Sequence, residues 1–251
     1  MIVRTFLHVG CGPQHKGPMT PGFDGPDWSE IRLDIDPSVS PDLIGAMTDM
    51  SAVQTGSMDA VFSSHNIEHL YPHEVPVALS EFQRVLKDDG FVVITCPDLL
   101  SVAQFIVERG LGETAYMSPM GPITPLDMLY GHQGAMGAGN LFMAHRGGFT
   151  AQTLLETLQR AGFGKITVIG RKSWFVLWAV ATKALCDDAT MTALAKKHIP
   201  GFVGQISTAK AAAAQPVPAP PPQIDKTGEA PVAAQAPPSP SSSKSQHKRR
   251  R

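Results

Sequence analysis

Two apolar runs, each ending in residues suited to a nucleotide, constrain this chain more than any other feature. Leu7-His8-Val9 leads into Gly10-Cys11-Gly12, where backbone can turn tightly or approach a ligand closely. The second run, Leu33-Asp34-Ile35-Asp36-Pro37, ends in carboxylates. In a doubly wound sheet, ligands lie beyond the carboxyl ends of the strands, and an acid after the second strand binds ribose hydroxyls. The pair of runs therefore predicts a nucleotide site.

Further apolar runs predict the rest of a sheet. Continuous apolar stretches of this kind are typical of strands that are buried on both faces. The predicted strands are residues 3–9, 31–35, 42–45, 59–63 and 90–97, with helices at 75–87, closed by Gly90, and at 99–109. Strands that alternate with crossovers favour a parallel α/β sheet.

The later part of the chain adds a hairpin. A helix begins after Thr150, a good N-cap residue, and ends at Gly162. Residues 165–170 and 174–182 then predict two strands joined by a short turn, with Trp174, Phe175 and Trp178 expected in the core. The sheet is therefore expected to be mostly parallel and to finish in an antiparallel hairpin.

Two connections are unsuited to helices. Residues 13–26 contain several glycines and prolines, which prevent a regular helix, and residues 38–41 are too few for a crossover helix. One edge of the sheet should therefore have little helical cover. Residues 110–148 are irregular and rich in Gly, Pro and Met, and we interpret them as a lid or acceptor-binding wall.

The domain boundaries follow from composition. Residues 211–251 consist largely of Ala, Pro, Ser and Gln, which cannot bury enough apolar surface to offset the entropy of ordering, so a disordered tail is expected there. Residues 1–184 are then the folded domain, and residues 185–210 are a helical extension of uncertain extent, with one helix near 189–197.

Charge and cysteine content limit the classes of partner and compartment. The tail has six basic and two acidic residues, so a chain of net charge −1 leaves about −5 on residues 1–210. That balance argues against nucleic-acid binding. Three scattered cysteines, no apolar run long enough to span a bilayer and a strand starting near Met1 predict a cytoplasmic protein.

In these features the chain resembles class I S-adenosylmethionine-dependent methyltransferases, in particular the type 11 group of small-molecule enzymes. The resemblance covers residues 4 to about 182 and implies a Rossmann-like fold. It rests on five segments in order: Leu7–Gly12, Leu33–Pro37, Met47–Met50, Asp59–Leu70 and Glu81–Gly90.

The resemblance implies a role for each segment, with S-adenosylmethionine as cofactor and a small-molecule acceptor as partner. It places Gly10 and Gly12 against the methionine part of the cofactor and Asp34, or alternatively Asp36, at the ribose hydroxyls. The remaining implied contacts are Asp49 with the adenine amino group, Met50 with the adenine ring, and Ser64 and His65 with the reacting end. No metal ligand is expected.

Two departures from the family pattern bear on the cofactor. His8 occupies the place of an acid that usually helps to hold the ammonium group. A dinucleotide, the other class of ligand for such a turn, would need a third glycine and a helix N-terminus for its pyrophosphate. This chain has His15 and a proline-rich loop there, which favours the phosphate-free methyl donor.

Methyl transfer by in-line displacement needs an aligned nucleophile and exclusion of water. A hydroxyl acceptor would also need a general base, for which His65 is the first candidate, followed by His145 and His132. Two alternatives remain: a zinc hydrolase using the H-x-x-E-H sequence of His65, Glu68 and His69, and a non-catalytic interaction module with a methyltransferase fold.

Overall fold

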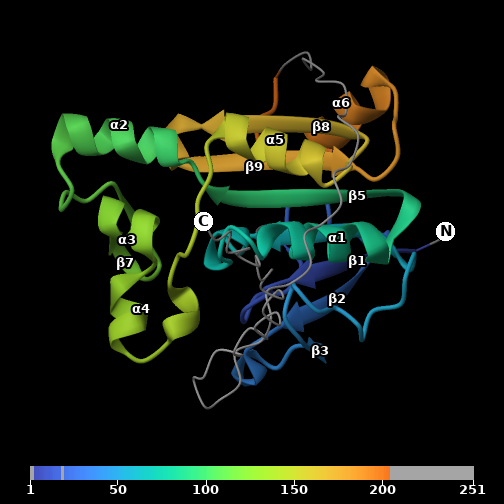
Figure 1. The fold of residues 1–251 in the computed structure, drawn as a ribbon, viewed down its shortest axis with the longest axis horizontal. Helices are drawn as coiled ribbons and strands as arrows, with labels where there is room; N and C mark the ends of the chain where they lie inside the picture. The colour runs from blue at the N-terminus through green and yellow to red at the C-terminus, as the bar shows by residue number, and fades with distance from the viewer. Residues whose placement is uncertain (1–2, 18–19, 204–251) are drawn as a thin grey trace, which may run out of the picture. The chain divides into compact units, whose positions relative to one another are not determined.

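A seven-stranded mixed sheet forms the centre of the computed structural model, which describes residues 3–17 and 20–203. The strand order is β3-β2-β1-β4-β5-β9-β8, from the lower to the upper edge in Figure 1. The strands are β1 (Arg4–Val9), β2 (Trp28–Asp34), β3 (Leu43–Ile44), β4 (Met58–Ser64), β5 (Leu86–Pro97), β8 (Lys165–Arg171) and β9 (Val176–Thr182). The first five pair in parallel, and β9 is antiparallel to both β5 and β8. The predicted fold class is confirmed.

The central strands separate two apolar cores because successive side chains point to opposite faces. In β5, Val92, Ile94 and Cys96 face one core, whereas Phe91 and Val93 face the other. The first core is covered by α1 (Val75–Val85) and α5 (Ala151–Arg160), and the second by α6 (Asp188–His198). Helix α6 lies where the sequence predicts a helical extension.

An aromatic side chain takes the place of a helix between β1 and β2. In the described residues of this connection there is no helix, as predicted, and the chain instead buries Phe23 completely. The Phe23 ring stacks on Phe6 at 4.4 Å and meets the edge of Trp28 at 4.9 Å. On its other side lies His198 of α6, with the ring centroids 4.4 Å apart. Loop and helix thus cover the second core together.

Residues between β5 and α5 fold into short elements at one end of the sheet. These are α2 (Leu99–Arg109), β6 (Tyr116–Ser118), β7 (Gly121–Ile123), α3 (Pro125–Tyr130), α4 (Gln133–Gly137) and the 3₁₀ turn η3 (Leu141–Met143). Figure 1 shows the helices of this group beyond the arrowhead of β5. The segment returns to its starting point, because Asp98 pairs with Phe149 and Leu99 N donates to Phe149 O at 3.0 Å.

Some element boundaries differ from the sequence prediction, and two of these differences change the role of a predicted residue. Helix α1 ends at Val85, and Leu86 enters β5 directly by pairing with Met58 on β4, so Gly90 is a tightly packed strand residue and not a helix cap. Strand β9 begins at Val176 because Lys172–Trp174 form a 3₁₀ turn, η4. Trp174 is therefore 57% exposed and does not belong to the core.

Three features complete the fold. The remaining 3₁₀ turns are η1 (Pro37–Val39) and η2 (Ile67–His69). In the part of the chain that the structure describes, no helix has the length and apolar character needed to cross a membrane. The predicted tail, residues 211–251, lies outside the described residues.

Candidate active site

The glycine turn after β1 adopts a backbone conformation that requires glycine. Gly10 and Gly12 have φ angles of +62° and +53°, in the left-handed region. A Cβ on Gly10 would lie only 1.9 Å from the side-chain nitrogen of Asn66, which follows β4. A Cβ built on Gly12 would have no neighbouring atom within 4 Å. The turn therefore packs tightly against the β4 end on one side and leaves room for a ligand on the other.

Asp34, the last residue of β2, is tied to this turn. Its Oδ2 accepts a hydrogen bond from Gly12 N at 2.7 Å, and its Oδ1 accepts one from Asp36 N at 2.9 Å. Asp36 is partly exposed and caps η1, where its carboxylate accepts from Ser38 N. This hydrogen bonding lowers the pKa of Asp36. Asp34 is therefore the acid that the fold holds in place at the turn.

A cavity of about 290 Å³, here called the glycine-turn cavity, lies at the carboxyl ends of β1, β2 and β4. Five of the predicted cofactor residues line it: Gly10, Gly12, Asp34, Asp36 and His65. The other lining residues are Val9, Pro13, Leu33, Ile35, Val39, Gly45, Ala46, Met47, Asn66, His69, Leu70, Asn140, Phe142, Met143 and Arg146.

Three other predicted cofactor residues do not line this cavity. Asp49 is exposed, and a hydrogen bond from Ser51 lowers its pKa. Met50 is fully buried in the first core, whereas Ala46 and Met47 occupy the cavity wall. Ser64 forms a hydrogen bond to the Thr95 hydroxyl at 2.8 Å and is likewise absent from the lining.

Sequence reasoning missed Arg32, which joins the walls of the glycine-turn cavity. Its buried guanidinium donates to Gly12 O at 2.6 Å and Gln14 O at 3.0 Å in the glycine loop. It also donates to Ser40 O at 2.7 Å and Val39 O at 3.2 Å beside η1. The signal in the sequence is an arginine between two apolar strand residues, Ile31 and Leu33.

His8 does not line the glycine-turn cavity. Its ring lies in the second, aromatic core, and its Nδ1 contacts Glu30 Oε1 at 2.7 Å. Glu30 Oε2 accepts from Lys16 N at 2.8 Å, so the pair anchors the loop after the glycine turn. Burial lowers the pKa of His8 and outweighs the opposing effect of Glu30. This residue is part of the loop's support and does not line the cavity.

A second cavity, of about 210 Å³, lies beside the first and is here called the histidine cavity. It is lined by all three predicted catalytic histidines, His65, His132 and His145. Its other lining residues are Glu68, His69, Pro97, Tyr116, Ser118, Met120, Ile123, Asp127, Met128, Met143, Trp174 and Phe175. His65, His69 and Met143 line both cavities, so the two cavities share a wall.

His65 is held at this shared wall by its backbone. Its φ angle of +50° is rare for a residue with a side chain, and its N donates to Thr95 O at 3.0 Å. The ring is about half exposed, and its Nδ1 lies 3.5 Å from Glu68 Oε1. A strained backbone at the end of β4 thus places an accessible imidazole between the cavities.

The hydrogen bonds of His132 and His145 fix different tautomers. His132 Nδ1 accepts from Ala135 N at 3.0 Å, so its Nε2 carries the proton and cannot act as a base. His145 Nδ1 lies 2.9 Å from Met128 O and must donate to it, which leaves the Nε2 lone pair free. Burial lowers the pKa of His145, so this imidazole is neutral at pH 7.

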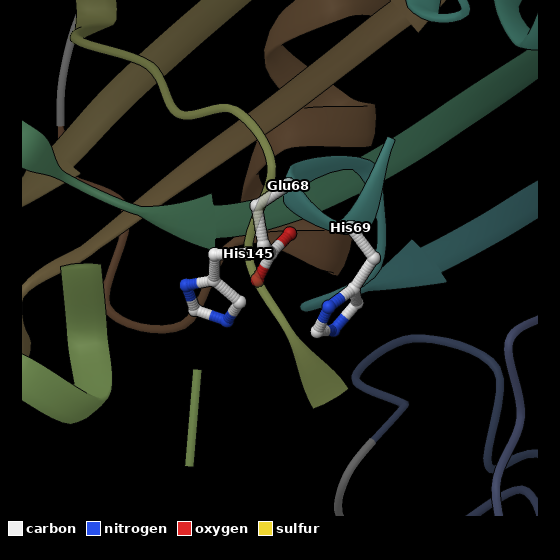
Figure 2. A group of neighbouring side chains, drawn as sticks. All are labelled: Glu68, His69 and His145. Carbon is white, nitrogen blue, oxygen red and sulfur yellow. The ribbon is translucent and has the colours of Figure 1, made fainter. Parts of the chain in front are cut away.

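Glu68 is buried in the centre of the histidine cluster (Figure 2). Its side chain lies beside His69 and His145. Burial by itself would raise the pKa of Glu68, but the neighbouring histidines lower it by a larger amount. The pKa of Glu68 therefore lies below its ordinary value. Glu68 and His69 belong to a single 3₁₀ turn, so the helical geometry required by an H-x-x-E-H zinc motif is not formed.

Comparisons with known proteins agree with the resemblance predicted from the sequence. Residues 7–94 match the methyltransferase domain family model. A search of curated proteins found no match.

Among solved structures, a SAM-dependent methyltransferase from Methanosarcina mazei is 18% identical, covers 74% of this chain and 95% of its own, and has a TM-score of 0.45. A 1,6-didemethyltoxoflavin-N1-methyltransferase from Burkholderia thailandensis, with S-adenosylhomocysteine bound, is 13% identical, with 72% of each chain covered and a TM-score of 0.43. A SAM-dependent methyltransferase from Aquifex aeolicus is 13% identical, with 73% and 85% covered and a TM-score of 0.43.

The family match spans β1 to β5 and therefore contains the glycine turn, Asp34, Arg32 and His65. It agrees with the predicted enzyme class and methyl donor, S-adenosylmethionine. Over residues 7–94 the chain is thus similar in sequence to a methyltransferase domain.

Proposed function

We propose that this protein transfers the methyl group of S-adenosylmethionine to a small molecule bound in the histidine cavity. The observation that carries the proposal is the shared wall. The glycine-turn cavity and the histidine cavity meet at His65, His69 and Met143, so a donor in one would face an acceptor in the other.

The glycine-turn cavity suits the cofactor on the residues present. Asp34 offers carboxylate lone pairs beside a turn that is free of side chains, which suits the ribose hydroxyls. Asp36, at the same cavity, is the alternative acceptor. Ala46 and Met47 supply the apolar wall that the sequence assigned to Met50. When bound, S-adenosylmethionine would supply the methyl group from its sulfonium. The remaining thioether, S-adenosylhomocysteine, is the leaving group.

The histidine cavity suits a small aromatic or polar acceptor. Tyr116, Trp174 and Phe175 provide flat apolar surface, while the histidines provide polar groups at the opposite wall. At about 210 Å³ the cavity has room for a small molecule. These walls would orient the acceptor toward the donor, and alignment is a main requirement for displacement at an activated methyl group.

His65 is the residue we assign as general base for an acceptor that must lose a proton. It lies at the wall common to both cavities, and Glu68 Oε1 is 3.5 Å from its Nδ1, where a carboxylate stabilises the imidazolium. His145 retains a free Nε2 lone pair and is the second candidate. His132 is a hydrogen-bond donor to the cavity by its tautomer, which removes it as a base.

Two measurements on the purified full chain test the proposal. Isothermal titration with S-adenosylhomocysteine should show one site of micromolar or tighter affinity. Incubation with methyl-labelled S-adenosylmethionine and a panel of hydroxylated and amine-bearing aromatic metabolites should label at least one acceptor. The absence of cofactor binding contradicts the proposal, and binding without turnover across the panel favours a non-catalytic module.

The acceptor found in that panel then tests His65. His65→Gln should lower kcat by on the order of 100-fold and leave cofactor affinity near the wild-type value, because a base acts on the acceptor's proton. His73→Gln is the matched control, since His73 is an exposed histidine that lines neither cavity. Equal kcat values for the two variants would exclude His65 as the base.

A further inference from the structure

We propose that Glu68, His69 and His145 bind a divalent first-row transition-metal cation, with zinc as the best match. One potential ligand atom from each residue lies within 4.8 Å of the other two, and Figure 2 shows the three side chains grouped together. This set of ligands differs from the H-x-x-E-H motif. His65 is not a member, and His145 lies 76 residues after His69 in the chain.

The buried carboxylate points to a ligand. Glu68 is 1% exposed, and neither of its side-chain oxygens has a hydrogen-bond partner among the described residues; the half-exposed His65 makes a longer contact, with its Nδ1 3.5 Å from Glu68 Oε1. A buried ionised carboxylate without hydrogen bonds costs several kcal/mol, so such groups are paired or bind metals. A cation held between Glu68 and the two imidazoles supplies the missing partner.

Both imidazoles already have the tautomer that a metal requires. His69 Nδ1 lies 3.1 Å from Ala144 O, and His145 Nδ1 lies 2.9 Å from Met128 O. A carbonyl only accepts, so each Nδ1 carries the proton and each Nε2 presents its lone pair. Metal-bound histidines almost always donate their other ring N–H in this way, which orients the ring and raises its basicity.

The backbone joins the two segments that carry the ligands. Arg146 N and Gly147 N both donate to Glu68 O, at 2.9 and 3.0 Å. The residue before them, His145, donates its own N to Tyr130 O at 3.1 Å. The segment that bears His145 is therefore fixed to the η2 turn that bears Glu68 and His69, whether or not a metal is bound.

The donor set indicates the class of metal. Two imidazole nitrogens and one carboxylate oxygen suit zinc and its first-row neighbours, whereas magnesium and calcium prefer oxygen ligands. Ligand atoms about 2.1 Å from a tetrahedral zinc are separated by about 3.4 Å, so side chains within 4.8 Å must close by at most about 1.4 Å.

Three protein ligands leave one coordination position open, which is the pattern of catalytic and not structural zinc sites. Here Glu68, His69 and His145 all line the histidine cavity, so the open position faces the acceptor space. In this respect only, the inference rests on the proposed function: an acceptor oxygen bound to the cation would be a better nucleophile, because a bound cation lowers the pKa of a coordinated hydroxyl.

The test measures metal binding without any acceptor. The full chain is stripped with a chelator, dialysed and titrated calorimetrically with zinc chloride; one equivalent should bind with micromolar or tighter affinity. Glu68→Gln and His145→Asn should each weaken binding by at least about 100-fold, since each removes a ligand. His73→Gln, an exposed histidine outside the cluster, should leave the affinity unchanged. Thermal unfolding of each metal-free variant verifies that it is folded.

Cobalt provides a readout on the wild-type chain alone. Cobalt(II) in a site of two imidazoles and one carboxylate should give visible d–d absorption. Added zinc should remove this absorption by displacing the cobalt in a one-to-one ratio. If this absorption does not develop, or if folded Glu68→Gln and His145→Asn bind zinc as tightly as His73→Gln does, the inference is wrong. Titration of the same metal-free protein with S-adenosylhomocysteine tests the proposed function separately, because the cofactor residues Gly12 and Asp34 lie outside the metal cluster.

Discussion

Asp34 and Asp36 stand two residues apart, yet the structure gives them different surroundings. Asp34 is buried and accepts hydrogen bonds from Gly12 N and Asp36 N, whereas the partly exposed Asp36 caps a short surface turn. Both line the glycine-turn cavity. The difference lies in the hydrogen bonds that hold each carboxylate in place.

Asp34→Ala should weaken S-adenosylhomocysteine binding by at least about tenfold. The substitution removes a charged acceptor and also frees the Gly12 N–H, and one hydrogen bond to a charged group contributes about 1.5–3 kcal/mol. Asp36→Ala should stay within about threefold of wild type, because only a surface cap is lost. Calorimetric titration of both variants measures the difference; equal losses would show that the acids have been assigned the wrong roles.

Residue types and spacing predicted part of the site and could not predict the rest. Gly10, Gly12 and Asp34 were identifiable because each follows a recognisable apolar run. His132 could not be assigned from sequence, because its tautomer depends on one hydrogen bond from Ala135 N. The Glu68 and His145 contact was equally hidden, since it depends on how an irregular segment returns to the sheet.

The loop between β1 and β2 shows how a connection without a helix keeps its shape. Phe23 fills the apolar space that a helix would cover, and Arg32 binds four carbonyls from the loop and the η1 region. An arginine fork can satisfy carbonyls in several directions at once, which an ammonium group cannot do from the same position. Arg32 therefore ties the start of the loop to the η1 region.

Arg32→Lys should destabilise the protein and weaken cofactor binding together. The lysine keeps the charge but reaches fewer carbonyls, so buried acceptors lose their partners at a cost of about 1–3 kcal/mol each. We expect the free energy of unfolding in urea, followed by tryptophan fluorescence, to fall by about 2–4 kcal/mol. Arg109→Lys, at an exposed position at the end of α2, is the control and should change neither quantity.

Element types followed the sequence well where apolar periodicity was continuous, as in α2, whose bounds Leu99–Arg109 were predicted to the residue. They failed where long-range pairing decided the outcome. Leu86 leaves α1 because Met58 offers it a strand partner, and Trp174 leaves β9 because a 3₁₀ turn intervenes. Neither partner is visible in a local window of sequence.

The second core makes the stability of the whole domain depend on pH through His198. This residue is 1% exposed, packs against Phe23 and Phe91, and uses Nδ1 to donate to Pro21 O at 2.9 Å. Its Nε2 has no partner among the described residues. Burial, helped by nearby positive charges, lowers the pKa of His198 to about 4.

Because the folded-state pKa is below the unfolded value of 6.5, His198 contributes stability that is complete above pH 6.5 and is lost as the pH falls toward 4. The loss should reach about 3 kcal/mol. His198→Phe removes the titration, so its free energy of unfolding should decline less steeply between pH 6.5 and 4. Parallel urea titrations across this range make the comparison; identical slopes would exclude His198 as the origin of the pH dependence.

The hydrogen-bonded contact between Leu99 and Phe149 has a consequence for how such a protein can diversify. Residues 99–149 leave the sheet and return to it at one point, while most residues of the glycine-turn cavity come from the first seventy positions. Residues 99–149 therefore form an insertion that is structurally separable from the sheet. Its content can be exchanged without breaking the strand order, and an exchange confined to residues that line only the histidine cavity would leave the wall of the glycine-turn cavity intact.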